Sequence, residues 1–124
     1  MAFNPCLFLN LSCKLSEDSN YDDESKYRTS ISRAYYAAFL VTRTYLESKG
    51  YNYNYDPLKQ ERENVHSKVF HDLKKRNPHI SNILFKLRQN RNNADYDLNK
   101  QIKKGITISS LKSAEMIIET ISKL

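Results

Sequence analysis

One stretch, residues 80–98, constrains the fold most, because its apolar side chains recur at alternating steps of four and three residues. That spacing is typical of a helix with one face turned to a core. The positions are Ile80, Leu84, Leu87, Arg91, Ala94 and Leu98. Arg91 stands where an apolar residue is expected, and burying a charge is costly unless it has a partner. Two alternatives follow: Asp95, one turn later, pairs with Arg91, or the helix face opens there into a pocket.

Glycine and proline are scarce, with two glycines and three prolines in 124 residues. A β-rich chain needs more of both for its turns, so the composition favours an all-helical fold. The breakers fall between periodic stretches, which predicts helices over residues 4–15, 23–49, 58–76, 80–98 and 107–124. In the last of these the expected core-facing residues are Leu111, Ala114, Ile118 and Ile121, with Ile117 and Leu124 beside them. Residues 16–25 form a polar loop or the start of the second helix, and Asn77-Pro78 and Gly105 separate the later helices. We therefore expect one domain, residues 1–124, folded as an all-α, up-and-down bundle of four to five helices.

The expected helix over residues 23–49 is the longest, and it is apolar over a wide arc. A helix of that kind contacts neighbours on two sides, so we expect it at the centre of the bundle. Its middle carries small residues, which let a neighbouring helix come close. These are Ala34, Ala37 and Ala38.

Tyr51, Tyr53 and Tyr55 alternate with other residues, mostly asparagine, in the loop over residues 50–57. One interpretation is an exposed row of rings that stacks on bases or contacts a partner. The other, which we prefer, is a lid that packs back onto the bundle.

The formal net charge is +6 and is unevenly distributed. Residues 17–24 hold five acidic side chains and no basic one, whereas residues 59–91 are net basic. A basic half favours a polyanionic partner, nucleic acid first. Lysine-rich helices are also common as plain solvated surfaces, so charge alone is a weak indication.

The two cysteines, Cys6 and Cys13, are seven residues apart, two helical turns on one face and too far for a disulfide. No further cysteine offers a metal-ligand spacing, so we expect neither metal nor cofactor. Free buried thiols fit a reducing compartment, and we expect a cytoplasmic protein. No run of about 20 apolar residues exists, so no membrane span is predicted.

Two motifs together resemble the HEPN superfamily (higher eukaryotes and prokaryotes nucleotide-binding). The first is Ser32-Arg33-Ala34-Tyr35-Tyr36-Ala37-Ala38-Phe39 on the second expected helix, and the second is Arg91-Asn92-Asn93-Ala94-Asp95-Tyr96-Asp97 late in the fourth. His66 and Phe70 stand where the family often has a histidine and an aromatic residue on its third helix. The second motif is similar to the small stand-alone branch with an Arg-x-x-Ala-Asp-Tyr signature. The resemblance covers roughly residues 23–124.

The resemblance implies a helical bundle that forms a homodimer. Many HEPN proteins are metal-independent endoribonucleases of toxin–antitoxin pairs, often beside a minimal nucleotidyltransferase, or of phage defence systems. In those nucleases an Arg-x4-6-His motif from each protomer meets across the dimer. Here no arginine is followed by histidine at that spacing: five to seven residues after Arg91 the chain has Tyr96, Asp97 and Leu98.

RNA cleavage without metal needs a base for the 2′-hydroxyl, an acid for the leaving oxygen and positive charge on the phosphorane. Arg91 supplies the charge, Asp95 orients Arg91 or acts as the base, and His66 is the imidazole that the fold can bring near. Tyr96 lies about 140° around the helix from Arg91, so we expect it to join only at a dimer interface or through a bend. The candidate catalytic residues are therefore Arg91, Asp95, Tyr96 and His66, and the candidate binding residues are Arg33, Tyr36, Arg88 and Asn92.

The competing interpretation of these residues is structural. Arg91 and Asp95 then form only an intrahelical pair, Tyr96 packs in the core with its hydroxyl satisfied, and His66 is a packing histidine. Two functions follow. The first is a HEPN protein of a defence or toxin–antitoxin system that is, or descends from, an endoribonuclease acting on RNA or a nucleotide. The second is a non-catalytic HEPN partner of a nucleotidyltransferase or larger effector. In the second, the tyrosines of the 50–57 loop contact the partner.

Overall fold

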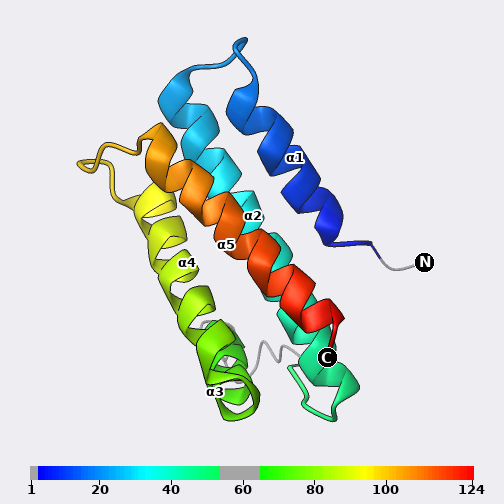
Figure 1. Cartoon of the computed structure of the whole chain (residues 1–124). Helices are drawn as coiled ribbons and strands as arrows, with labels where there is room; N and C mark the ends of the chain where they lie inside the picture. The colour runs from blue at the N-terminus through cyan, green and yellow to red at the C-terminus, as the bar shows by residue number, and fades with distance from the viewer. Residues whose placement is uncertain (1–2, 54–64) are drawn as a thin grey trace, which may run out of the picture.

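The computed structural model describes residues 3–53 and 65–124. These residues form five helices and no strand: α1 (Cys6–Glu17), α2 (Asp23–Ser48), α3 (Val65–Arg76), α4 (Pro78–Tyr96) and α5 (Lys104–Ser122). The predicted all-α fold is confirmed. In Figure 1, α1, α2, α4 and α5 run lengthwise in alternating directions, and the short α3 lies at one end beside α4.

The central helix is α2, as its wide apolar arc predicted. It packs against α1, α3, α4 and α5. Ala34, Ala37 and Ala38 have no exposed surface, and such small side chains allow neighbouring helices to approach closely. Large side chains enclosed in this core come from four helices and include Tyr35, Leu46, Leu73, Leu87 and Ile117.

Side-chain caps set the starts of two helices. The Asp22 carboxylate accepts a hydrogen bond from the backbone N–H of Ser25 at 3.0 Å and so begins α2. The Asn77 side chain accepts one from the N–H of Ile80 at 3.1 Å, and Pro78 follows at the first turn of α4. Gly50 has a φ of +98°, in the left-handed region that glycine adopts without strain, and it ends the chain's longest helix.

Some expected boundaries are wrong. Helix α1 ends at Glu17 rather than at residue 15, and α4 ends at Tyr96. Leu98 therefore lies outside the helix, and 84% of it is exposed, so it is not part of the core face. Gly105 does not precede the last helix but lies in its first turn, because α5 begins at Lys104. The first part of the expected helix over residues 58–76, up to residue 64, lies outside the described residues.

The buried face of α5 also differs from the expected one. Ala114 and Ile121 are buried as predicted, but Leu111 and Ile118 are only half-buried. Ile117 is fully buried, and the last residue, Leu124, is 57% exposed rather than packed. The true face is completed by the small polar Thr107 and Ser110, each with no exposed surface. Their hydroxyls donate to backbone carbonyls of their own helix, which is how polar residues fit a core-facing position.

The loop after α2 packs back onto the bundle, as preferred, at least as far as residue 53. Tyr53 is 4% exposed and its hydroxyl donates to the Asp72 carboxylate at 2.5 Å. Tyr51 is half-buried, with its ring stacked on that of Tyr53. Tyr55 lies outside the described residues.

The cysteines are free but not buried as expected: Cys6 is half-buried and Cys13 is exposed. Within residues 3–53 and 65–124 no helix is both long and apolar enough to cross a membrane.

Candidate functional site

The misplaced charge of α4 has partners. The Arg91 side chain is 12% exposed, and its Nε lies 2.8 Å from the Asp95 carboxylate one turn later. Its terminal nitrogens donate to the Tyr36 hydroxyl of α2 at 3.0 Å and to the Asn92 side-chain oxygen at 3.2 Å. Among the described residues Nε has no aligned hydrogen bond, so Asp95 is held by charge attraction rather than by a directed bond. Of the two alternatives for this position, pairing with Asp95 is the correct one.

Three tyrosine rings surround the same guanidinium. Its central carbon lies 5.7 Å from the ring centre of Tyr35, 5.2 Å from that of Tyr36 and 5.5 Å from that of Tyr96. These distances fall in the range of cation–π attraction. Arg33 stacks on Tyr36 in the same way, at 4.6 Å. Two motifs about 60 residues apart in sequence therefore meet where α2 packs on α4.

The placement of Tyr96 overturns both expectations for it. It needs no dimer to reach Arg91, because its ring already lies beside the guanidinium within one chain. Nor does it pack in the core, since 70% of it is exposed. At the last helical position of α4 its long side chain can turn back towards the preceding turn, as helical side chains tend to do.

A polar groove opens on one side of this cluster. It has a volume of about 470 Å³, and its walls come from α2 and α4. Asp95 lines it, with Ser32, whose hydroxyl donates to Asp95 Oδ2 at 3.1 Å. Arg28 and Arg33 also line it, so both signs of charge face the groove.

His66 lies on the other side of the cluster, on α3. Its Nδ1 is 2.6 Å from the Tyr35 hydroxyl, and its ring stacks on Phe39 with 4.2 Å between centres. Burial, and then the positive charges of Arg88 and Arg91, lower the His66 pKa to about 4. Burial raises the pKa of Tyr35, so that phenol stays protonated. We assign the Tyr35 hydroxyl as donor to Nδ1, which leaves the imidazole proton on Nε2.

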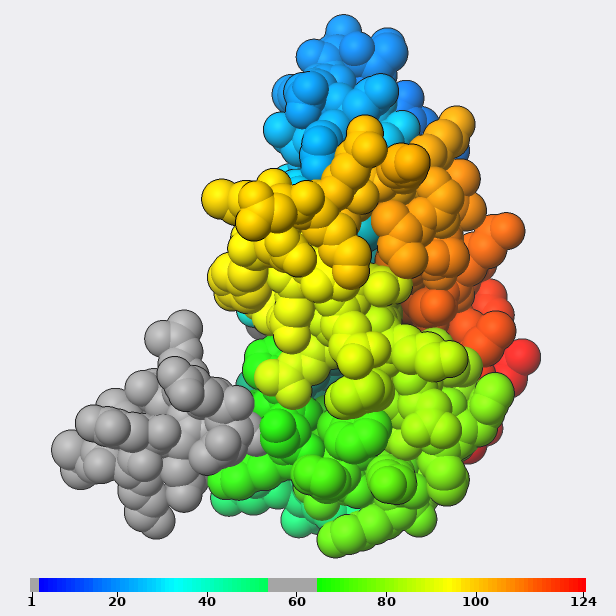
Figure 2. All heavy atoms as spheres, turned by 90° about the vertical axis from the view of Figure 1, so that its left-hand side faces the viewer, coloured from blue at the N-terminus to red at the C-terminus, as the bar shows by residue number. Residues whose placement is uncertain are grey.

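The remaining predicted residues divide between the two sides. Asn92 is exposed and contacts Arg91, whereas Arg88 is half-buried and faces the His66 side. A pocket of about 220 Å³ lies on this side, where α3 meets α4. Both helices face the viewer in Figure 2. All eight predicted residues thus lie in or beside one cluster between α2, α3 and α4. Their functional roles stay predictions.

Two residues of the first motif, Ser32 and Tyr35, were not among the site residues predicted from the sequence. Tyr35 is the residue that joins the two sides, because it contacts both His66 and Arg91. Its central place in that motif was the available signal. Which ring points to which partner depends on the α2–α3 and α2–α4 packing, which sequence periodicity does not determine.

A second arginine centre, at the end of α4, was not predicted from the sequence. Arg28 donates to the backbone carbonyls of Asn93, Ala94, Asp97 and Lys100. Glu24 holds Arg28 in an ion pair at 3.1 Å and accepts a hydrogen bond from the N–H of Ile102. Carbonyls at a helix C-terminus have no partner within the helix, so Arg28 caps α4 and fixes the connection to α5. The four-residue spacing of Glu24 and Arg28 was the only sequence signal.

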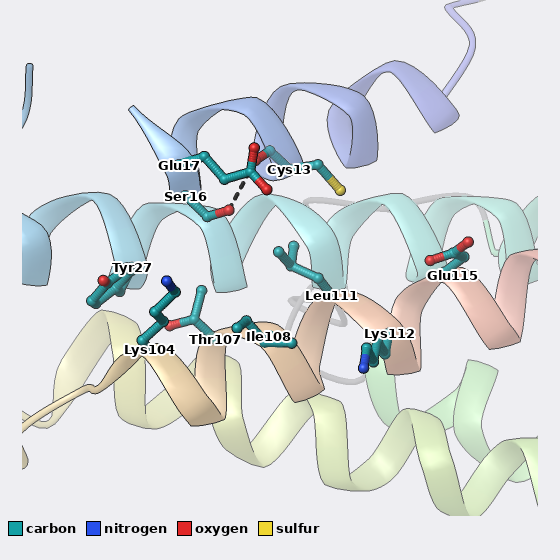
Figure 3. Close-up of a pocket in the computed structure, with 10 residues that line it drawn as sticks. All are labelled: Cys13, Ser16, Glu17, Tyr27, Lys104, Thr107, Ile108, Leu111, Lys112 and Glu115. Atoms are coloured by element: carbon teal, nitrogen blue, oxygen red, sulfur yellow. Dashed lines mark hydrogen bonds between the residues drawn. The ribbon is translucent and has the colours of Figure 1, made fainter. Parts of the chain in front are cut away.

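A further pocket, of about 380 Å³, lies between α1 and α5 on the opposite flank of α2 (Figure 3). Apolar side chains of α5 line it, namely Ile108 and Leu111. Its charged residues are of both signs, Lys104 and Lys112 against Glu17 and Glu115. Burial, Glu115 and Glu17 all raise the pKa of the Cys13 thiol there. The pocket favours neither a polyanion nor thiolate chemistry.

In the parts of the chain that the structure describes, no three His, Cys, Asp or Glu side chains are placed to hold a metal ion together.

Comparison with known proteins identifies the family. The model of the HEPN domain matches residues 14–124, which covers α2 to α5 and the last turn of α1. The chain therefore belongs to the HEPN domain family, as its motifs predicted. Neither a curated protein nor a solved structure matches it.

Proposed function

We propose that this HEPN protein binds RNA at the Arg91 cluster and cleaves it without a metal ion, as an effector of a prokaryotic defence or toxin–antitoxin system. One observation carries the proposal. Arg91 is held by exchangeable side-chain partners, between tyrosine rings that bases can stack on, beside an open groove. The family contains ribonucleases and toxin–antitoxin members, which is consistent with it.

Phosphate binding at Arg91 requires an exchange of partners. The guanidinium presents a planar fork that matches two phosphate oxygens. Its bonds to Tyr36 and Asn92 are to neutral groups, so a doubly hydrogen-bonded phosphate is a stronger partner than either. Tyr96, 70% exposed beside the fork, then offers its ring to a neighbouring base.

The cleavage step is a transesterification. The 2′-oxygen attacks the phosphorus, its proton passes to a base, and the 5′-oxygen leaves with a proton from an acid, which yields a 2′,3′-cyclic phosphate and a 5′-hydroxyl. Both contacts of Asp95 use Oδ2, so we assign Oδ1 as the base, the Tyr96 phenol as the acid and Arg91 as the charge on the phosphorane. His66 acts through Tyr35, which it holds against Arg91.

The test is RNA cleavage in EDTA. A 5′-labelled single-stranded RNA is incubated with the wild type, with Arg91→Ala and with Arg43→Ala. Arg43 is a matched control, because it also pairs with a carboxylate one turn on, Glu47, but lies on α2 away from the cluster. We expect Arg91→Ala to lower the rate about a hundredfold or more and Arg43→Ala to leave it within twofold. RNA that stays intact at micromolar wild-type protein, or an unchanged rate in Arg91→Ala, contradicts the proposal.

A second function, a non-catalytic HEPN partner of a minimal nucleotidyltransferase or larger effector, is favoured by one observation. The only imidazole in the cluster is partly buried, neutral at physiological pH and bonded to Tyr35, and the usual histidine after Arg91 is absent. This function predicts intact RNA together with a stable complex between the protein and the product of an adjacent gene, measured by size-exclusion chromatography. The tyrosines of the 50–57 loop are the expected contact with this partner. Tyr51 is the one to substitute, because Tyr53 is buried and stabilises the fold. Co-expression that gives no complex contradicts it.

We further propose a homodimer, in which each site gains groups from the partner. Light scattering at micromolar concentration measures it directly. A mass of one chain, about 14.6 kDa, contradicts it.

A further inference from the structure

The pocket between α3 and α4 has a feature that the proposed chemistry does not use. Phe70 and Phe85 line it with their rings 5.4 Å apart, and Phe85 is 46% exposed. At about 220 Å³ it is smaller than the roughly 300–1,000 Å³ typical of sites for drug-sized ligands. Its size and aromatic walls suit one flat ring system.

An unsatisfied donor lies at the same pocket. Arg88 lines it, and Arg88 Nε is buried without a hydrogen-bond partner among the described residues. A buried donor without a partner costs free energy, so such a group indicates a missing acceptor. His66 brings a second donor, because its Nδ1 is bonded to Tyr35 and its proton is on Nε2.

The polar groups of the pocket are therefore mainly donors. Among the described residues that line it none is acidic; the others with polar side chains are Tyr35, Ser67 and His71. An arginine fork is matched by two adjacent acceptors, which guanine presents at O6 and N7. Adenine presents an amino donor at the corresponding place, so it fits this set of groups less well.

The pocket is also adjacent to the phosphate site. Arg88 and Arg91 are three residues apart on α4, and residues at that spacing are neighbours on a helix surface. Tyr35 lines the pocket and contacts the Arg91 guanidinium as well. A nucleotide whose phosphate is bound at Arg91 has its base within reach of the α3–α4 pocket.

We propose that this pocket binds a single guanine base of an RNA strand, stacked on Phe70 and Phe85 and recognised by Arg88. This inference rests on the proposed function, because it names the base that the same RNA site selects. Arg88 is then the residue that sets specificity, while Arg91 holds the backbone.

The experiment measures binding of fluorescent single-stranded oligouridine that carries one central guanosine, adenosine or cytidine. We expect the wild type to bind the guanosine strand about tenfold more tightly than the others. Arg88→Lys keeps the positive charge but loses the fork, and should bring the three affinities within twofold of one another. Arg91→Ala should weaken all three strands while their ratio is kept. Lys86→Ala, which removes an exposed charge of the same helix, should keep both the order and the ratio.

Circular dichroism confirms that each variant is folded. Phe85→Ala, at a half-exposed position, is a second test of the pocket. Loss of the guanosine preference in this variant supports the proposal. RNA binding without guanosine preference, or a preference that survives in Arg88→Lys, overturns this inference alone. If the wild type binds none of the strands, the proposed function fails and the inference with it.

Discussion

The two arginine centres between α2 and α4 are similar in burial but opposite in their partners. The Arg28 side chain is 17% exposed and the Arg91 side chain 12%. Arg28 donates to four backbone carbonyls and an acidic side chain, whereas Arg91 contacts only side chains, two of them neutral hydrogen-bond acceptors. Backbone carbonyls at a helix end cannot move away, but side chains change rotamer at little cost. Arg28 is therefore suited to hold the fold and Arg91 to exchange its partners for a ligand.

Arg28→Ala should have the largest effect on stability. It removes the hydrogen bonds to four carbonyls around the end of α4 and the ion-pair partner of Glu24, so we expect the free energy of unfolding to fall by about 3 kcal/mol. Urea denaturation measures it. Arg33→Ala is the control, since Arg33 is half-buried on the same helix but stacks on rings, and it should cost about 1 kcal/mol. Equal losses in the two variants would remove the structural role given to Arg28.

Arg91→Ala should reduce RNA affinity more than it reduces stability. We expect RNA affinity to fall by about 2 kcal/mol, or roughly thirtyfold, because a charge-assisted bidentate contact to phosphate is lost. Stability should fall by only about 1 kcal/mol, since Asp95 is 24% exposed and reaches water when unpaired. Fluorescence anisotropy and urea denaturation give the two numbers. A stability loss as large as that of Arg28→Ala, with RNA affinity kept, would make Arg91 a second structural arginine.

His66, which is bonded to Tyr35 beside Arg91, makes the stability of the fold depend on pH. Its pKa is about 4 in the fold, against an ordinary value of 6.5, so the unfolded chain binds more protons between these values. Stability therefore rises with pH across this window: the contribution is complete above about pH 6.5 and is lost as pH falls towards 4. We expect the wild type to lose about 1–3 kcal/mol across it relative to His66→Gln. Parallel stability profiles of the two proteins would mean that His66 is not held neutral by its surroundings.

Tyr96→Ala should have the smallest effect on stability and on RNA affinity. Its ring is 70% exposed, so stability should change by less than about 0.5 kcal/mol. Loss of a stacking ring should weaken RNA binding by about 1 kcal/mol, and Tyr96→Phe should restore that binding but not cleavage if the phenol is the acid. Full cleavage by Tyr96→Phe would remove the acid role and leave stacking intact.

Much of the fold was predictable from local patterns. The starts of α2 and α4 follow from Asp22 and from Asn77-Pro78, because caps act within a few residues of sequence. The wide apolar arc with Ala34, Ala37 and Ala38 placed α2 at the centre. The errors concern burial and helix ends that depend on the whole bundle. Leu98 is exposed because α4 already ends at Tyr96. Gly105 lies in the first turn of α5, where a glycine is tolerated.

By itself the sequence determined the all-α class and the HEPN family, since these depend on periodicity and motifs. It offered the pairing of Arg91 with Asp95, one turn apart, as one of two alternatives, and the structure decided for the pair. Only the tertiary structure decided which residues from other helices meet Arg91 and His66. Tyr35 joins them across three helices, and Arg28 reaches carbonyls more than 60 residues away. Such contacts depend on how helices cross and on which rotamer each side chain takes. The local sequence pattern contains neither.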